Sequence, residues 1–280
     1  MQPRDLFRLL KTTVYEWMDH RAMQAAAALA YYALFSIAPL LLIVISIVGL
    51  VFGPDTARAS VMDQMRGLVG ESGARGIEQM LAGVRDPTAN AAAGLVGVVV
   101  LLFGASGVFG QLKDALNTIW EAPAPPGGMI ASYVRGRFLS FAMVLAVGFL
   151  LLVSLLVSAG LQAVGTYMTG LLPGSEGIWE GVNFLVSWGT ITLLFAMIFK
   201  YIPDKEIRWR DVWIGALISA LLFSLGKTLI GLYLGRSAVA SAYGAAGSLV
   251  VLLVWVYYSS LLVLLGAEFS HVQATRDRAV

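Results

Sequence analysis

Long apolar runs without any charged residue dominate this sequence. A charge at the centre of a bilayer costs at least about 2.5 kcal/mol, and roughly 20 apolar residues cross the hydrocarbon core. Five such runs lie between Arg21 and Asp55, Asp86 and Lys113, Arg137 and Glu176, Glu180 and Lys200, and Arg236 and Glu268. A sixth run, from Asp211 to Arg236, is interrupted only by Lys227. The pattern predicts six transmembrane helices, at about 25–52, 91–112, 138–164, 181–200, 212–235 and 243–268.

The segments on either side of the first predicted span are amphipathic. Residues 1–21 have apolar side chains at helical spacing, namely Leu6, Leu10, Val14 and Trp17. This spacing, with charges between, favours an interfacial helix on the cytoplasmic membrane surface. Residues 53–90 contain two apolar-periodic stretches divided by Gly70 and Gly73, which predicts a short helical extracytoplasmic cap. The predicted fold class is therefore an all-α integral membrane protein, with residues 1–280 as one membrane domain.

The distribution of basic residues predicts the orientation of the spans. Cytoplasmic loops retain Lys and Arg during membrane insertion. If the N-terminus lies inside, 13 of the 19 basic residues fall on the inner side. These are Arg4, Arg8, Lys11, Arg21, Lys113, Arg135, Arg137, Lys200, Lys205, Arg208, Arg210, Arg276 and Arg278. We therefore expect both termini in the cytoplasm.

The composition excludes several classes of protein. The 280 residues are 58% hydrophobic and 13% charged, so there is too little charge to coat a water-soluble fold of this size. The net charge is +2, and the basic residues form no continuous stripe, so we expect no nucleic-acid partner. The absence of cysteine excludes disulfides and thiolate chemistry.

Three stretches carry a family resemblance: AAALAYYALFSIAPLL at 26–41, FGASGVFGQLKDALNTIW at 103–120, and the segment 233–271. The turn KYIPD at 200–204 fits as well. The chain resembles the YihY/BrkB family of bacterial inner-membrane proteins. The resemblance implies a six-span, multi-pass protein of the cell inner membrane, linked in some members to serum resistance or virulence and suspected of transport. Some members have carried a ribonuclease label.

The residues for enzymatic chemistry do not cluster in the sequence. A metal-dependent nuclease needs grouped His and Asp ligands, whereas this chain has only His20 and His271, each near a predicted inner membrane boundary. The sequence Gly226-Lys227-Thr228 imitates the end of a phosphate loop, but no strand precedes it. We therefore expect no catalytic residues, no metal and no cofactor, and we do not expect an enzyme.

Polar groups at membrane depth are the candidates for function, because they are costly there. Pro39 lies near the middle of the first span, where it removes a helical hydrogen bond and favours a kink. Tyr32, Ser36 and Pro39 share one face of this helix. That face is either a structural kink with its free carbonyl satisfied locally, or part of a substrate path.

A second group of polar residues lies at the predicted inner mouth. Gln111 and Asn117 lie near the point where the second span leaves the bilayer, as either a solvated helix end or a cavity lining. Glu268 ends the sixth span at the same depth. We expect Glu268 to pair with Lys113 or Arg137, because an unpaired carboxylate beside lipid is costly.

The remaining candidates lie on the last two spans. Lys227 lies late in the fifth span, where its side chain either snorkels to the outer headgroups or faces an anionic substrate. Tyr257 and Tyr258 need hydroxyl partners if they are buried. Small residues favour close helix packing at Gly104, Gly107, Gly110, Gly231, Gly235, Gly244 and Gly247.

Two functional hypotheses remain open at this point. The first is a transporter of an amphipathic or anionic substrate such as an envelope lipid, with membrane lipids as its surroundings. The second is a non-transporting scaffold or regulator of envelope assembly. A nuclease would require a metal cluster that the sequence lacks.

Overall fold

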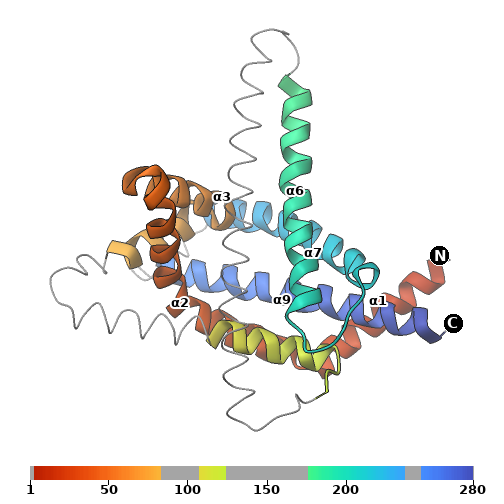
Figure 1. Cartoon of the computed structure of the whole chain (residues 1–280). Coiled ribbons are helices and arrows are strands. Elements are labelled where there is room, and N and C mark those ends of the chain that lie inside the picture. Colours follow the sequence, from red (N-terminus) through yellow and green to blue (C-terminus); the bar gives the residue numbers. More distant parts are fainter. Residues whose placement is uncertain (1–2, 83–106, 124–175, 237–246, 280) are drawn as a thin grey trace.

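The computed structural model describes residues 3–82, 107–123, 176–236 and 247–279, and its ordered elements there are all helices. The elements are α1 (Pro3–Asp19), α2 (Ala22–Phe52), α3 (Pro54–Ala82), α6 (Glu176–Tyr201), α7 (Trp209–Arg236) and α9 (Gly247–Ala279), together with a helix at 107–119 (Figure 1). The described part of the chain contains no strand, which confirms the prediction of an all-helical fold.

Three of these helices are long and apolar enough to cross a membrane. The apolar windows are Phe184–Tyr201 in α6, Trp209–Gly226 in α7 and Leu249–Arg276 in α9. A shorter apolar segment, Ala22–Ala38, lies in α2. The predicted span at 138–164 and most of the one at 91–112 lie outside the described residues. The count of six spans therefore stays a prediction.

Helices α7 and α9 run antiparallel and pack closely (Figure 1). Each contains a glycine followed four residues later by a serine: Gly215 and Ser219 on α7, and Gly266 and Ser270 on α9. A Cβ added at Gly215 would overlap Ser270, and one at Gly266 would overlap Ser219. Ser219 also donates a 3.2 Å hydrogen bond to the Leu262 carbonyl. Small residues thus let the two backbones touch, as is typical of membrane helices.

Two turns in the first third of the chain depend on left-handed backbone conformations. Arg21, between α1 and α2, has φ 52°, and Gly53, between α2 and α3, has φ 86°. Within α3, Gly70 is non-helical with φ 75°, and it divides the predicted cap into two helical halves, as the sequence pattern indicated. The α3 residues Val61, Met62, Ala74, Ile77 and Leu81 pack with α2 and α9 in one apolar cluster.

A second apolar cluster joins the 107–119 helix to α2, α6, α7 and α9. Its fully buried members include Leu116, Phe199, Val212 and Leu264. Helix α1 crosses the C-terminal part of α9, where Leu9 packs with residues of α9. Both chain termini lie at this end of the molecule (Figure 1). These apolar contacts hold together the end of the molecule at which the C-terminal part of α9 lies.

Candidate functional site

A fully buried carboxylate lies near the C-terminal end of α9. Glu268 has no exposed surface, and its Oε2 is 2.9 Å from Nδ1 of His20. His20 stands in the turn between α1 and α2, so the pair joins two segments separated by 248 positions in the chain. An ionised carboxylate accepts hydrogen bonds only, so Nδ1 of His20 carries the hydrogen when Glu268 is charged.

The pair leaves part of the carboxylate unsatisfied. Oε1 of Glu268 has no hydrogen-bond partner among the described residues. Glu16, one helical turn before His20, brings a second carboxyl group toward Glu268. Burying an ionisable group inside a membrane helix is expensive unless it has a partner or a task. Oε2 of Glu268 is therefore paired with His20, while Oε1 is buried near the Glu16 carboxyl group without a hydrogen bond among the described residues.

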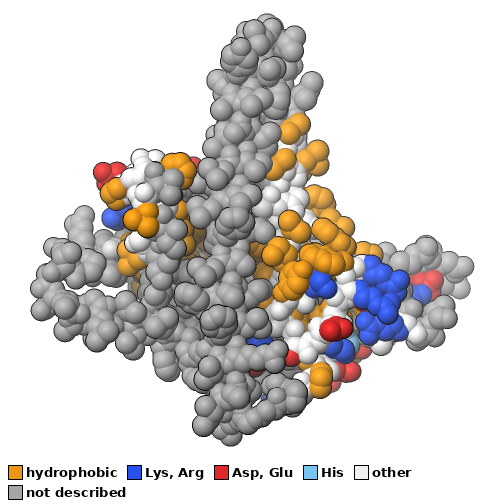
Figure 2. Space-filling view, viewed as in Figure 1, with side chains coloured by type: hydrophobic (Ala, Val, Ile, Leu, Met, Phe, Trp, Pro, Cys, Tyr) orange, Lys and Arg blue, Asp and Glu red, His pale blue; other side chains and the backbone are white. Residues whose placement is uncertain are grey.

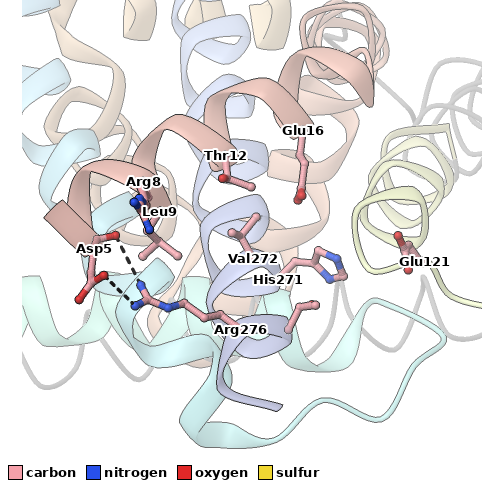
Figure 3. A pocket seen from close by; sticks show the side chains of 10 residues that line it. Asp5, Arg8, Leu9, Thr12, Glu16, Glu121, His271, Val272 and Arg276 are labelled. Atoms are coloured by element: carbon pink, nitrogen blue, oxygen red, sulfur yellow. Dashed lines mark hydrogen bonds and ion pairs between the residues drawn. The ribbon is translucent and has the colours of Figure 1, made fainter. Parts of the chain in front are cut away.

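A cavity of about 450 Å³ lies between α1, α9 and the turn after the 107–119 helix (Figure 3). Glu268 and His20 do not line it, but Glu16, which lies near Glu268, does. One part of its wall carries Glu16, Glu121 and His271. Another part carries Arg8 and the ion pair between Arg276 and Asp5, whose charged atoms are 3.4 Å apart. The cavity therefore has both positive and negative side chains around it.

His271 is buried in the wall of this cavity. Its ring packs edge to face on Trp120, with 5.4 Å between the ring centroids. Nδ1 of His271 has no hydrogen-bond partner among the described residues. Both histidines of the chain thus lie near the end of α9. In the part of the chain that the structure describes, no three His, Asp or Glu side chains are grouped closely enough to hold a metal ion.

The predicted pairing of Glu268 with Lys113 is wrong. Lys113 lies 2.9 Å from Asp204 in the turn between α6 and α7. Asn117 strengthens the same contact, because its Nδ2 donates to Asp204 Oδ2 at 3.0 Å and its Oδ1 accepts from the Asp204 amide at 2.8 Å. The physical reason is rotational: the 107–119 helix turns this face toward the α6–α7 turn. Arg137, the other predicted partner, lies outside the described residues.

Asp114 adds a further carboxylate to the contact with the α6–α7 turn. Partial desolvation raises the pKa of Asp114 above its ordinary value. The Lys113 ammonium opposes this rise, and the Asp204 carboxylate adds to it. Two carboxylates, those of Asp114 and Asp204, therefore lie near the single ammonium group of Lys113.

The candidates on α2 lie in a packed part of the molecule. Ser36 is buried and donates to the Tyr32 carbonyl at 3.1 Å, and also approaches the Ala33 carbonyl at 3.3 Å. The Tyr32 ring fills the space that a side chain at Gly107 would need. Helix α2 continues through Pro39, whose side chain lies outside what the structure describes, and Figure 1 shows α2 changing direction along its length. Gln111 is half-buried on the neighbouring helix.

The candidates on α7 and α9 have mainly packing contacts. The Tyr258 ring lies against Gly226, and its hydroxyl donates to the Leu222 carbonyl at 3.1 Å. Tyr257 packs against the large apolar cluster. Lys227 lies within α7, but its side chain is outside the described part of the structure.

The structure describes only some of the glycines that were predicted to pack against another helix. Gly110 has open space where a side chain would go. Gly231 and Gly235 lie within α7, and Gly247 begins α9. Gly104 and Gly244 lie outside the described residues.

Sequence reasoning missed two features of this region. It assigned His20 no partner, although His20 and Glu268 were both placed near the inner membrane boundary. It also missed Gly215 and Gly266, although each begins a Gly-x-x-x-Ser step that favours close helix contact. Both features are present in the sequence. Neither identifies a contact partner, because the sequence does not give the rotation of each helix about its axis.

The long apolar helices and their close packing define an all-helical membrane protein. The chain belongs to the family described as Virulence factor BrkB, whose sequence profile matches residues 13–279. It is 29% identical to a UPF0761 membrane protein of Pseudomonas paraeruginosa, over 90% of this chain and 59% of the relative. It is also 29% identical to a UPF0761 membrane protein of Stenotrophomonas maltophilia, over 97% of this chain and 62% of the relative.

The chain thus spans about three fifths of the length of these relatives. A UPF0761 membrane protein of Verminephrobacter eiseniae is 35% identical over 62% of this chain. No solved structure matches the chain.

Proposed function

We propose that this protein moves an amphipathic or anionic substrate, such as an envelope lipid, across the bacterial inner membrane. The supporting observation is the fully buried Glu268, which pairs with the partly exposed His20 and has Glu16 and His271, two residues of the charged cavity wall, as its neighbours in space and in the chain. Ionisable groups at membrane depth are costly, and in membrane proteins they usually mark substrate, ion or proton paths. The proposal includes six spans, cytoplasmic N- and C-termini and no enzymatic step.

The cavity wall has charges of both signs, three carboxylates and two guanidinium groups, so it is the apolar surface beside these charges that supports an amphipathic substrate. Arg8 lines the wall without an ion-pair partner among the described residues, whereas Arg276 is shared with Asp5. Exposed apolar residues lie along the outer face of α1, at Phe7, Leu10, Val14 and Met18. This face suits the boundary between headgroups and acyl chains. A substrate with a charged head and an apolar body would therefore meet both kinds of surface.

The path proposed here does not run between α7 and α9. Gly215 and Gly266 bring these two backbones into contact, which leaves no room for a substrate between them. The proposed path instead approaches the end of α9 from the side of α1 and the 107–119 helix, where the cavity lies.

The same close packing supports a second candidate function. Helices that touch along a Gly-x-x-x-Ser face form a stiff unit, which suits a non-transporting scaffold or regulator of envelope assembly. A scaffold would tolerate loss of the Glu268 charge if the fold remained intact, because its surfaces would be unchanged. A transporter that uses this site would not.

Reconstitution into liposomes separates the two functions. Wild-type protein, Glu268→Gln and the matched control Glu78→Gln on the exposed surface of α3 would be compared for movement of fluorescent phosphatidylglycerol between leaflets. We expect wild type and Glu78→Gln to move the lipid at equal rates and Glu268→Gln to lose at least about 90% of this rate, a tenfold effect that corresponds to about 1.4 kcal/mol. Equal rates for folded Glu268→Gln and wild type would contradict the proposed site.

A further inference from the structure

A second charged cavity lies at the turn between α6 and α7, outside the site proposed above. It has a volume of about 840 Å³, and four cationic side chains line it: Lys200, Lys205, Arg208 and Arg278. Glu206 is the one carboxylate in its wall. The cavity therefore carries a clear excess of positive charge.

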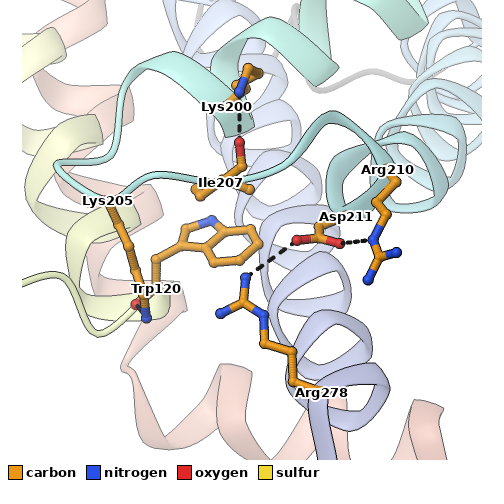
Figure 4. Close-up of polar contacts among 7 residues, drawn as sticks. All are labelled: Trp120, Lys200, Lys205, Ile207, Arg210, Asp211 and Arg278. Carbon is orange, nitrogen blue, oxygen red and sulfur yellow. Dashed lines mark hydrogen bonds and ion pairs between the residues drawn. The ribbon is translucent and has the colours of Figure 1, made fainter.

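Three of the four cationic side chains that line this cavity have a partner, and one has none in the part of the chain that the structure describes. Arg278 shares Asp211 with Arg210, at 3.4 Å in each case (Figure 4). Lys200 donates to the Ile207 carbonyl at 2.6 Å, and Lys205 donates to the Trp120 carbonyl. These bonds fix the lysines but do not neutralise them. Arg208 is exposed, and its guanidinium group has no ion-pair or hydrogen-bond partner among the described residues.

The apolar windows of three candidate spans begin or end near this cavity. The apolar window of α6 ends at Tyr201, that of α7 begins at Trp209, and that of α9 ends two residues before Arg278. Tyr201 and Trp209 both line the cavity, and their rings are in edge contact at 5.8 Å. Lys200 lies 5.5 Å from the centroids of both rings. Aromatic residues mixed with basic ones are typical of the membrane–water boundary.

An apolar surface continues from the cavity along α7. Exposed side chains follow one another at spacings of one, three or four residues: Trp209, Trp213, Ile214, Leu217, Leu221 and Leu225. Figure 2 shows hydrophobic side chains directly beside a dense group of Lys and Arg. A ligand that fits both surfaces has a negatively charged head at the boundary and an apolar tail in the hydrocarbon.

We propose that this cavity binds the phosphate of an anionic phospholipid, with its acyl chains along the exposed face of α7. Basic pockets at the cytoplasmic ends of membrane helices attract anionic headgroups, and each basic residue near the surface contributes about fivefold in affinity. Arg208 supplies a free guanidinium for two hydrogen bonds to the phosphate. The site does not depend on the proposed transport function.

Lipid binding to the purified 280-residue chain in neutral detergent tests this site, with native mass spectrometry as the readout. The probes are dioctanoyl phosphatidylglycerol, dioctanoyl phosphatidylcholine and inorganic phosphate. The variants are Arg208→Gln, which removes the charge, Arg208→Lys, which keeps it, and Arg58→Gln, a matched exposed control on α3. Arg208 is exposed, so these variants are expected to fold.

We expect wild type to prefer phosphatidylglycerol over phosphatidylcholine by about tenfold, and about 0.5 M salt to reduce that preference. Arg208→Gln is expected to weaken phosphatidylglycerol binding about fivefold. Arg208→Lys keeps the charge but loses the paired hydrogen bonds, so we expect it to bind more tightly than Arg208→Gln and less tightly than wild type, with Arg58→Gln unchanged. Equal binding of the two lipids would overturn the proposal, as would equal losses in Arg208→Gln and Arg58→Gln. Inorganic phosphate that bound as tightly as phosphatidylglycerol would assign the cavity to a soluble phosphate and overturn the lipid assignment.

Discussion

Two polar contacts of the same length lie in very different surroundings. His20–Glu268 and Lys113–Asp204 both have 2.9 Å between the nitrogen and the carboxylate oxygen, and both join segments far apart in the chain. Glu268 is fully buried and its partner His20 is 21% exposed, whereas the side chains of Lys113 and Asp204 are 19% and 27% exposed. The distance within a pair therefore does not determine its contribution to the free energy of unfolding, because the cost of removing a charge from water dominates when the charge is buried.

The comparison also separates two kinds of task. The Lys113–Asp204 contact is reinforced by Asn117 and locks the 107–119 helix to the α6–α7 turn. Glu268, in contrast, keeps one oxygen without a partner among the described residues. A satisfied and partly solvated pair suits a structural role, and a partly satisfied buried carboxylate suits a functional one.

The largest expected effect comes from removing His20 alone. His20→Ala leaves the Glu268 carboxylate buried without its partner, which we expect to lower the free energy of unfolding by about 3 kcal/mol. Thermal unfolding in detergent measures this loss. A change below about 1 kcal/mol, the level of an exposed pair, would place Glu268 in a solvated position and remove the contrast between the two contacts.

A smaller net effect is expected when both members of the buried pair become apolar. In His20→Phe with Glu268→Leu no charge remains buried, so we expect the stability to return to within about 1 kcal/mol of wild type. The same unfolding measurement, made as a double-mutant cycle, gives the coupling between the two positions. Losses that simply add would show that the two side chains do not interact.

Lys113→Gln is expected to cost still less. The contact is partly exposed and Asn117 still holds Asp204, so we expect a loss of about 0.5 kcal/mol. Raising the salt concentration to about 1 M should remove most of the difference from wild type, because exposed charges are screened. A loss as large as that of His20→Ala would mean that the two contacts are equally buried.

The smallest effect is expected at Asp114, and it has the opposite sign. The raised pKa of Asp114 means that the folded state holds the proton more tightly than the unfolded state does. Its contribution is therefore most favourable below the unfolded pKa, and it falls as pH rises through the folded pKa. We expect Asp114→Asn to raise the unfolding temperature at neutral pH by about 1 °C, and to leave it unchanged at a pH below both values. A lower unfolding temperature at neutral pH would contradict this.

The helices themselves were predictable, because their signals are local. Apolar runs and charge spacing anticipated α2, α6, α7 and α9, and Gly70 marked the break in α3.

The partners were not predictable, because depth does not give the rotation of a helix about its axis. The Lys113 face turns toward Asp204, which lies 91 positions later in the chain. The left-handed Arg21 ends the turn after α1 and brings His20 onto α9. A left-handed arginine has no sequence signature, since that conformation is usual for glycine. Contacts of this kind depend on tertiary packing.

Site-directed crosslinking tests the central contact most directly, because the chain contains no cysteine of its own. His20→Cys with Glu268→Cys and, as a control, Lys113→Cys with Glu268→Cys would be treated in native membranes with a short thiol-to-thiol crosslinker. Mass spectrometry of the joined peptides is the readout. We expect the crosslink to form between positions 20 and 268 and not between 113 and 268. The reverse result would contradict the account.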